Sequence, residues 1–486
     1  MKQSIIRIIC FLLILAMVLG YTNRVFQLKH SDGIYSLTKF YELEDNSVDV
    51  LILGSSHAFE NFNTGVLWDS YGMASYILAG SMQPMWNTYY YLKEALKTQT
   101  PELIILEGYL TMWDQDYMED STTIKNNFGL KWSKNKIDSL KASVPRERWA
   151  EFFLSYEQYH TRYTELSAAD FLPNQNNRLY DDWKGFGCNM KTTPLDSIDV
   201  SALTQKMPLH TKTEQYYRAT IELALQNSIP IVVIISPYAG IQEDEHRRHN
   251  SAGDIAAEYG IPFLNCNTLI DEIGLDYTID AGDPAHLNYR GNQKFSRYIG
   301  AYLKDNFQIS DRRGQETYAS WQRSADFTRQ MIKDQQLTES WDLNEISGLL
   351  QDPEYLVIIS IDGNCNAADE TVRGFLMQQG ISEEALYGIW QKDGASVTWH
   401  SGAEYAERYI RTAAHDFCLR RSIHESGQYA NSIVMDNTPY RAVENGVNVL
   451  VFDRKTDKIA DVFGINTDDH NAIVRYSASG SSASTQ

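Results

Sequence analysis

Between residues 48 and 307 the chain alternates short apolar segments with amphipathic ones, and this alternation constrains its fold more than any other feature. The apolar segments are rich in β-branched residues and have the length of single strands, which we place at 48–53, 75–78, 103–106, 229–235 and 262–264. Helix-compatible segments separate them, at 84–96, 213–226, 251–259 and 292–303. Apolar strands joined through helices predict an α/β fold, in which a parallel sheet lies between two helical layers.

Two polar motifs lie where such a fold would bring them together. Gly-Ser-Ser-His at 54–57 directly follows the first predicted strand, and Asp-Pro-Ala-His at 283–286 precedes the last predicted helix. Ligands of parallel sheets bind at the carboxyl ends of strands. A serine hydroxyl becomes a nucleophile when an imidazole accepts its proton and a carboxylate orients that imidazole. The motifs therefore predict a Ser–His–Asp site, with a helix cap at the serines and a surface Asp-x-x-His as the structural alternatives.

The N-terminal region, residues 1–30, contains an uninterrupted apolar stretch from Ile8 to Tyr21 that follows Lys2 and Arg7. Signal peptides have an apolar core of ~7–15 residues, whereas a membrane-spanning helix needs about 20. A helix that starts at Ile5 approaches the second length, and no Ala-x-Ala-like cleavage site follows it. We expect a single N-terminal signal anchor in the cell membrane with the rest of the chain on the extracytoplasmic face; a cleaved signal peptide is the alternative.

Charge and cysteine content narrow the functional classes. The formal net charge is -20 and Lys and Arg do not cluster, which argues against a nucleic-acid partner. No two cysteines form a Cys-x-x-Cys pair, so we expect neither a zinc site nor another metal or cofactor. Export would permit a disulfide between Cys365 and Cys418, and free buried thiols are the equally good alternative.

Several segments lie outside the strand–helix alternation. Residues 110–209 are rich in Trp, Tyr, Asn and Asp with weak periodicity, which indicates an insertion or cap within a first domain at 31–309. Residues 310–349 are polar and helix-compatible and predict a connector. A second, smaller α+β domain is expected at 350–476, with strands at 355–361, 446–453 and 459–463 and helices at 368–379 and 382–390. The Ser-rich tail, 477–486, needs no fold.

The strand-Gly-Ser-Ser turn and the late Asp-x-x-His-Leu-Asn resemble the SGNH/GDSL hydrolase superfamily. Their form is similar to the exported branch of DltD-like and alginate O-acetyltransferase-like proteins, which modify cell-envelope polymers. The resemblance covers about residues 45–305 and implies an SGNH-like α/β/α domain with three layers. It also implies that Ser56 is the nucleophile and that His286 and Asp283 complete a catalytic triad.

The same resemblance implies an oxyanion hole. The backbone N–H of Ser56 would be one donor, and Gly80 matches the glycine of the family's second block. The third block, Gly-x-Asn-Asp, is absent, and Glu-Gly-Tyr at 107–109 follows the third strand instead. Asn87 is then the candidate for the missing side-chain donor.

Other polar side chains near the predicted sheet edge have two interpretations. His57 adjoins the nucleophile and Tyr238 follows the fourth strand, so both are candidates for substrate contact, with packing inside the fold as the alternative. His210, His246 and His249 are expected in solvent.

What the resemblance implies about function is extracytoplasmic transfer of an O-linked acyl group, acetyl or similar, through an acyl-Ser56 intermediate. The acceptor or substrate would be a cell-surface glycan or teichoic acid, and a membrane-bound O-acyltransferase would supply the acyl group. The residues alone do not separate a transferase from a carbohydrate esterase, since one triad serves both. The competing interpretation is a non-catalytic, carbohydrate-binding surface scaffold with a degenerate SGNH domain, which the absent third block favours.

In the second domain, Ile-Ile-Ser-Ile-Asp-Gly at 358–363 and Gly-Val-Asn-Val at 446–449, followed by Lys-Thr-Asp-Lys at 455–458, resemble the interleukin-like EMT inducer (ILEI/FAM3-type) domain. Similar domains accompany glycan-processing enzymes, so the resemblance implies carbohydrate or protein binding by analogy. Trp390 and Trp399 are the candidate sugar-stacking rings, with core packing as the alternative.

Overall fold

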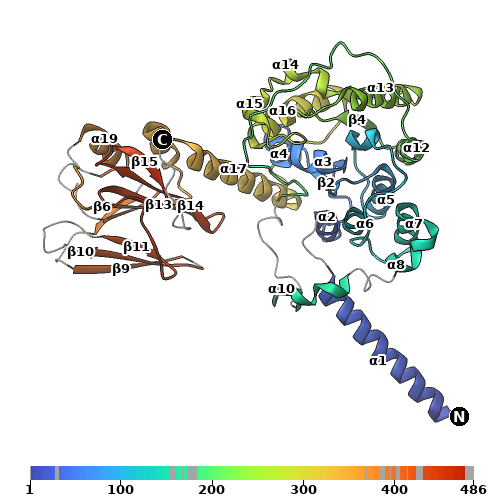
Figure 1. Cartoon of the computed structure of the whole chain (residues 1–486), viewed down its shortest axis with the longest axis horizontal. Coiled ribbons are helices and arrows are strands. Elements are labelled where there is room, and N and C mark those ends of the chain that lie inside the picture. The colour runs from blue at the N-terminus through green and yellow to red at the C-terminus, as the bar shows by residue number, and fades with distance from the viewer. Residues whose placement is uncertain are drawn as a thin grey trace. The chain divides into compact units, whose positions relative to one another are not determined.

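The structure is a computed structural model that describes residues 2–27, 32–153, 159–166, 168–171, 183–366, 369–381, 389–394, 396–400, 405–412, 414–422 and 431–476. The predicted tail at 477–486 lies outside these residues. The chain divides into two compact units, Met1–Asp326 and Phe327–Gln486 (Figure 1). The boundary falls inside one helix, α17 (Ala319–Glu339), so the predicted connector is shared between the two units.

The first unit is built on a five-stranded parallel sheet, as the alternation of apolar and amphipathic segments predicts. Its order is β2-β1-β3-β4-β5. The strands are β1 (Val50–Gly54), β2 (Ser75–Ala79), β3 (Leu103–Glu107), β4 (Ile231–Ile235) and β5 (Phe263–Asn265). Every residue of the first four strands is buried, because helices cover both faces of the sheet.

Helices form a layer on each side of this sheet (Figure 1). Leu51 and Leu53 of β1 pack in one core with side chains of α5 (Met85–Ala95) and α12 (Thr211–Gln226). Successive strand residues point to opposite faces, so Val50 and Ile52 face the other layer. The remaining main helices are α3 (Ser56–Asn61), α4 (Thr64–Tyr71), α13 (Glu243–Glu258) and α16 (Tyr289–Asn306).

The strand order creates a site for chemistry at the end of β1. β2 and β3 pair with opposite edges of β1, and ligands of open parallel sheets bind outside the carboxyl ends of the strands at such a switch point. Gly54 ends β1, where a Cβ atom would lie 2.7 Å from the Cβ of Glu107. Glycine therefore lets β1 and β3 approach closely directly before Ser55 and Ser56.

Part of the predicted insertion runs along the free edge of β2. Residues 183–190 are called here the edge segment. Its Lys184 carbonyl accepts a hydrogen bond from the Ile77 N–H of β2 over 3.0 Å. The Gly187 N–H donates to the Phe59 carbonyl over 2.7 Å. Earlier in the insertion lie α6 (Asp120–Asn127), α7 (Lys134–Ser143) and α8 (Trp149–Phe153). The edge segment thereby connects β2 with the helix that begins at Ser56.

The N-terminal helix α1 (Lys2–Phe26) has the length and apolar character predicted for a spanning segment. The most apolar 18-residue window within residues 3–26 has a mean hydropathy of 2.4, and the helix is long and apolar enough to cross a membrane. Most of its apolar side chains are exposed, whereas Val25 in the last turn is buried. Arg162 donates a hydrogen bond to the Phe26 carbonyl, so this last turn belongs to the folded unit. The helix α2 (Asp32–Phe40) follows.

The second unit contains two antiparallel sheets. The six-stranded sheet has the order β15-β14-β13-β6-β7-β8, and the four-stranded sheet has the order β12-β11-β10-β9. Their strands are β6 (Tyr355–Asp362), β7 (Ile389–Asp393), β8 (Ser396–His400), β9 (Tyr405–Arg411), β10 (Asp416–Ser422), β11 (Ser432–Met435), β12 (Thr438–Tyr440), β13 (Gly446–Asp453), β14 (Lys458–Asn466) and β15 (Ala472–Arg475).

One apolar core fills the space between these two sheets, and a second lies between the six-stranded sheet and the helices α18 (Leu343–Leu349) and α19 (Glu370–Gln378). The helix predicted at 382–390 is wrong at its end, because Ile389 and Trp390 belong to β7; the residues before them lie outside the described part. All five cysteines are free. The Cys365–Cys418 disulfide is therefore not formed.

Candidate active site

The structure brings Ser56, His286 and Asp283 into one hydrogen-bonded chain. Ser56 is the first residue of α3, and His286 lies in the loop before α16. The Nε2 atom of His286 is 2.8 Å from the Oγ atom of Ser56. Its Nδ1 atom is 2.9 and 3.0 Å from the two carboxylate oxygens of Asp283. An Nδ1 proton bound by the carboxylate leaves Nε2 free to accept the proton of the serine hydroxyl.

Local hydrogen bonds fix the loop that carries this acid and this imidazole. The Oδ1 atom of Asp283 accepts the backbone N–H groups of Ala285 and His286, over 2.8 and 3.0 Å. Asn61, the last residue of α3, accepts the N–H of Leu287 over 2.9 Å. The helix that begins with the serine therefore also positions the loop with the histidine.

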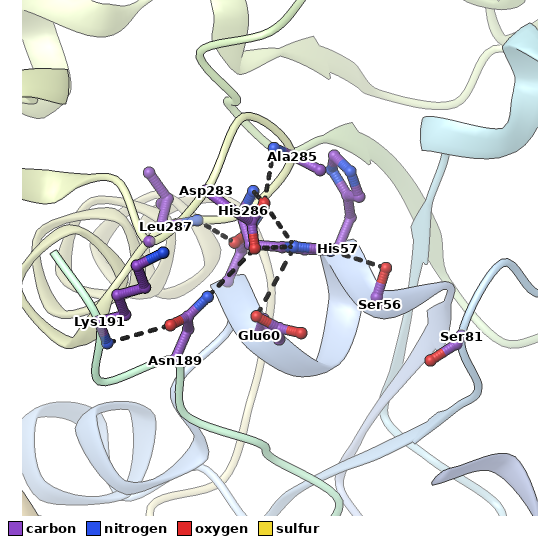
Figure 2. Close-up of polar contacts among 12 residues, drawn as sticks. Ser56, His57, Glu60, Ser81, Asn189, Lys191, Asp283, Ala285, His286 and Leu287 are labelled. Atoms are coloured by element: carbon purple, nitrogen blue, oxygen red, sulfur yellow. Dashed lines mark hydrogen bonds and ion pairs between the residues drawn. The ribbon is translucent and has the colours of Figure 1, made fainter. Parts of the chain in front are cut away.

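A second carboxylate lies beside the imidazole. Glu60 is one helical turn after Ser56, and its Oε2 atom is 3.7 Å from the Nδ1 atom of His286. Asn189 of the edge segment donates to Asp283 over 3.2 Å and lowers the pKa of Glu60, against the larger effect of burial. Figure 2 shows Glu60 and Asn189 next to the Asp283–His286 pair. The imidazole therefore has two acidic neighbours.

These charges set the protonation of the site. Burial by itself lowers the pKa of His286, but the Asp283 hydrogen bond and the charges of Glu60 and Asp283 outweigh burial and raise it. Burial would raise the pKa of Asp283, yet its hydrogen bond and attraction to His286 hold this pKa below its usual value. Burial raises the pKa of Glu60.

A buried aromatic layer supports the site from behind. The ring of His57 stacks on Tyr109 with centroids 3.5 Å apart and an interplanar angle of 12°. Tyr238 meets His57 edge-on, with centroids 5.0 Å apart. His57 and Tyr238 are both buried, which favours the packing alternative over a contact with substrate. Burial lowers the pKa of His57 well below its usual value, which keeps this imidazole neutral.

The histidines of α13 also differ from the prediction. His246 and His249 are buried rather than solvated. His249 lies 3.2 Å from the Tyr238 hydroxyl and 3.0 Å from that of Thr111. Burial lowers the pKa of His249 to about 3, which makes it a neutral hydrogen-bonding group of the core. His210 is partly exposed.

The three residues predicted for an oxyanion hole lie in different surroundings. The Ser56 N–H is in the first turn of α3, where backbone donors have no partner inside the helix. Gly80 follows β2, whose last residue pairs with Gly54, so it lies at the same sheet edge as the serine. The amide nitrogen of Asn87 has Asn127, Ser139 and Ser143 within hydrogen-bond distance, over 3.1, 3.0 and 3.2 Å, so its donors have partners inside the fold.

Within the described residues, one group has the chemistry of a metal site. Glu60, Asp283 and His286 each offer one ligand atom, and these three atoms lie within 4.8 Å of one another. Carboxylate oxygens and an imidazole nitrogen are ligands of divalent transition metals. A cation bound there would replace the proton between His286 and Asp283 and compete with the hydrogen bond of the triad.

Of the two tryptophans predicted as sugar-stacking rings in the second unit, the described part of the structure places the side chain of Trp390. Trp390 of β7 packs in the core between the six-stranded sheet and the helices and is 1% exposed, so core packing is correct for it. Trp399 pairs with it in β8, and the side chain of Trp399 lies outside the described part.

Sequence patterns pointed to the triad but not to its surroundings. Glu60 carried a detectable signal, since it follows Ser56 by one turn of helix and so shares its face. Asn189 carried none, because nothing in the weakly periodic insertion indicates that it returns to the site.

A scan against protein-family models finds no match for the chain, and neither does a search of curated proteins.

Proposed function

We propose that the protein is an extracytoplasmic, membrane-anchored serine acyltransferase or carbohydrate esterase with an SGNH-like first unit and an ILEI-like second unit. The observation that carries the proposal is the 2.8 Å contact between His286 and the Ser56 hydroxyl, with Asp283 on the other imidazole nitrogen. The parallel order of the sheet and the serine at the end of β1 support the SGNH resemblance.

In the proposed reaction, the Ser56 oxygen attacks the carbonyl carbon of an O-acyl group while the Nε2 atom of His286 takes the hydroxyl proton. The same proton then passes to the leaving alcohol, which yields acyl-Ser56. A sugar hydroxyl or water next attacks the acyl carbon and gives its proton to His286, and Ser56 is released with that proton. The N–H groups of Ser56 and Gly80 are the proposed oxyanion donors, each worth about 2.7–4 kcal/mol if lost.

The substrate in this proposal is a cell-surface glycan or teichoic acid that carries or receives acetyl or a similar group. A membrane-bound O-acyltransferase is the proposed source of the acyl group in the transfer direction. The apolar helix α1 supports an anchored protein, since 24 residues of it can span a membrane.

The test is covalent labelling of the full-length chain in detergent micelles with a fluorophosphonate probe. We expect labelling of wild type, a loss of at least about 10³-fold in Ser56→Ala and His286→Gln, and a retained label in the matched control Ser55→Ala. An unlabelled, correctly folded wild type that also fails to hydrolyse aryl acetates would instead support the non-catalytic scaffold.

A further inference from the structure

A large cavity adjoins the carboxylate side of the triad. Its volume is about 1100 Å³, and its walls come from α2, the edge segment and residues 316–323. Glu60 and Asn189 line it, and so does Ser81 at the end of β2; Figure 2 shows all three around the Ser56–His286 pair. Pockets for small ligands usually measure ~300–1000 Å³, so this cavity exceeds the space that an acyl group alone requires.

The walls combine aromatic rings with hydrogen-bonding groups. Four aromatic residues line the cavity. Trp183 and Trp321 are almost completely buried, whereas Tyr35 and Phe59 are half-buried and present parts of their rings. The face of an aromatic ring is electron-rich and packs against polarised C–H groups, such as those on the face of a sugar ring. Serine, asparagine and carboxylate groups between the rings can accept or donate the hydrogen bonds of sugar hydroxyls.

The charges of the residues that line the cavity favour a neutral glycan over a teichoic acid, which carries phosphate groups. Five carboxylates line the cavity, namely Asp32, Glu42, Glu44, Glu60 and Glu316, against the three cations Lys39, Lys184 and Arg323. One of these cations, Lys39, is paired with Glu42 over 3.0 Å. Lys184 lies over the Trp321 ring, 4.2 Å from its centroid. A polyphosphate chain would meet a net negative wall, which repels it over about a Debye length of ~8–10 Å.

We propose that this cavity is the binding site for a neutral glycan chain, which lies along the edge segment and presents its acylated or acceptor hydroxyl toward Ser56. The inference rests on the proposed function for its chemistry, and it narrows the substrate to neutral glycans and excludes teichoic acids. Glu60 and Asn189 then contact both the glycan and the triad, so they would couple sugar binding to the position of His286.

The experiment measures binding separately from catalysis, with the Ser56→Ala full-length chain in detergent micelles. This Ser56→Ala protein is applied to an array that carries neutral hexose and N-acetylhexosamine oligomers together with glycerol phosphate oligomers. In the same background, Ala319→Trp places an indole in the cavity wall, and Ala301→Trp is the matched control on the exposed side of α16. We expect neutral oligomers to bind, Ala319→Trp to weaken that binding at least tenfold, and Ala301→Trp to leave it unchanged.

Binding of glycerol phosphate oligomers alone, or equal binding by the two tryptophan variants, overturns the inference. The pair Glu44→Lys and Glu316→Lys, both exposed positions, is a second test that leaves the core intact. It should increase glycerol phosphate binding at least tenfold, and no increase contradicts the electrostatic exclusion. A failed glycan test with Ser56-dependent probe labelling would remove this inference alone, whereas glycan binding without labelling would remove the proposed catalysis alone.

Discussion

His286 has carboxylates on two sides, and this arrangement makes its protonation depend on Glu60 as well as on Asp283. Asp283 is within hydrogen-bond distance of Nδ1, while Glu60 acts from 3.7 Å through its charge. Glu107 lies deeper and also raises the pKa of His286. Burial raises the pKa of Glu107 itself to about 8, so its contribution grows as the pH rises through that value.

Glu60→Gln should shift the pH dependence of Ser56 labelling toward lower pH. His286 accepts a proton only when neutral, so labelling rises with pH through the pKa of this histidine. Loss of the Glu60 charge removes one group that raises this pKa, and more of the imidazole is neutral at a given acidic pH. The measurement is the labelling rate against pH, with the exposed Glu44→Gln as control. An unchanged or higher midpoint in Glu60→Gln would contradict the assigned coupling.

At the residue scale, the sequence predicted those side chains that local motifs identify. Ser56, Asp283 and His286 occur in two short motifs whose positions relative to a strand and a helix indicated one sheet edge. The partners of His57, Tyr238 and Asn87 could not be predicted, because they depend on which side chains of distant segments surround these residues. Asn87 fills a polar network with α6 and α7, and no local pattern indicates that network.

At the scale of elements, the edge segment holds β2 through one tightly packed glycine. Gly185 has φ +82°, and a Cβ atom there would lie 1.9 Å from the Ile77 carbonyl oxygen. Both the conformation and the contact exclude a side chain. The segment therefore lies directly on the strand, where it covers an otherwise free sheet edge and brings Asn189 to the site.

Gly185→Ala should destabilise the first unit by about 1–3 kcal/mol, because it adds a strained backbone and a steric overlap. The measurement is the thermal unfolding midpoint of the full-length chain. Gly348→Ala in α18 is the matched control, since its Cβ would meet no atom within 4 Å, and it should raise stability by about 0.4–1 kcal/mol. Equal midpoints for wild type and Gly185→Ala would show that the segment does not bind the strand this closely.

A carboxyl pair joins the C-terminal half of α17 to the sheet of the second unit. Asp334 accepts a hydrogen bond from the Tyr355 hydroxyl over 2.8 Å, and the charge of Asp453 acts on it. Burial, reinforced by the Asp453 charge, raises the pKa of Asp334 to about 8. The folded unit thus binds a proton that the unfolded chain releases near pH 4.

Asp334→Asn should make the second unit less sensitive to alkaline pH. In the wild type, protonated Asp334 makes its full contribution to the free energy of unfolding below about pH 4. This contribution is lost as the pH rises toward 8, by up to about 1.4 kcal/mol per pH unit. Asparagine keeps the acceptor for Tyr355 and does not titrate. Hydrogen exchange of peptides from β6 and β13, compared at equal pH, should show stronger protection in the variant at pH 8 than in the wild type. The reverse order would refute the raised pKa assigned to Asp334.

The sequence predicted those strands whose pattern of apolar residues is strong. The parallel strands are short, apolar and isolated by helices, so the predicted bounds agree with β1 to β5 within two residues. In the second unit, the 446–453 strand was identified because it is a continuous apolar run. The strands β7 to β12 and β15 were not, since half-buried strands such as β11 leave alternate residues partly exposed and their sequences mix charged or polar with apolar side chains.

At the scale of the whole molecule, the chain length between α1 and α2 limits how far the cavity can lie from a membrane. Asp32 follows Phe26 by six residues, which span at most about 22 Å when extended. Asp32 lines the proposed glycan site. An anchored α1 would therefore keep that site within reach of polymers and acyl carriers that are themselves held at the membrane.

Deletion of residues 2–20 should release the protein from membranes without unfolding the first unit. The deletion removes most of the exposed apolar surface of α1 but retains the last turn, with the buried Val25 and the Phe26 carbonyl that Arg162 binds. We expect the variant in the supernatant after carbonate extraction, with its unfolding midpoint and its aryl acetate turnover unchanged. Turnover of an ester tethered to lipid vesicles should fall, because α1 no longer concentrates the site at the surface. If the variant still sediments with membranes, another part of the chain attaches the protein; if vesicle turnover is unaffected, the short connection to α2 does not serve substrate access.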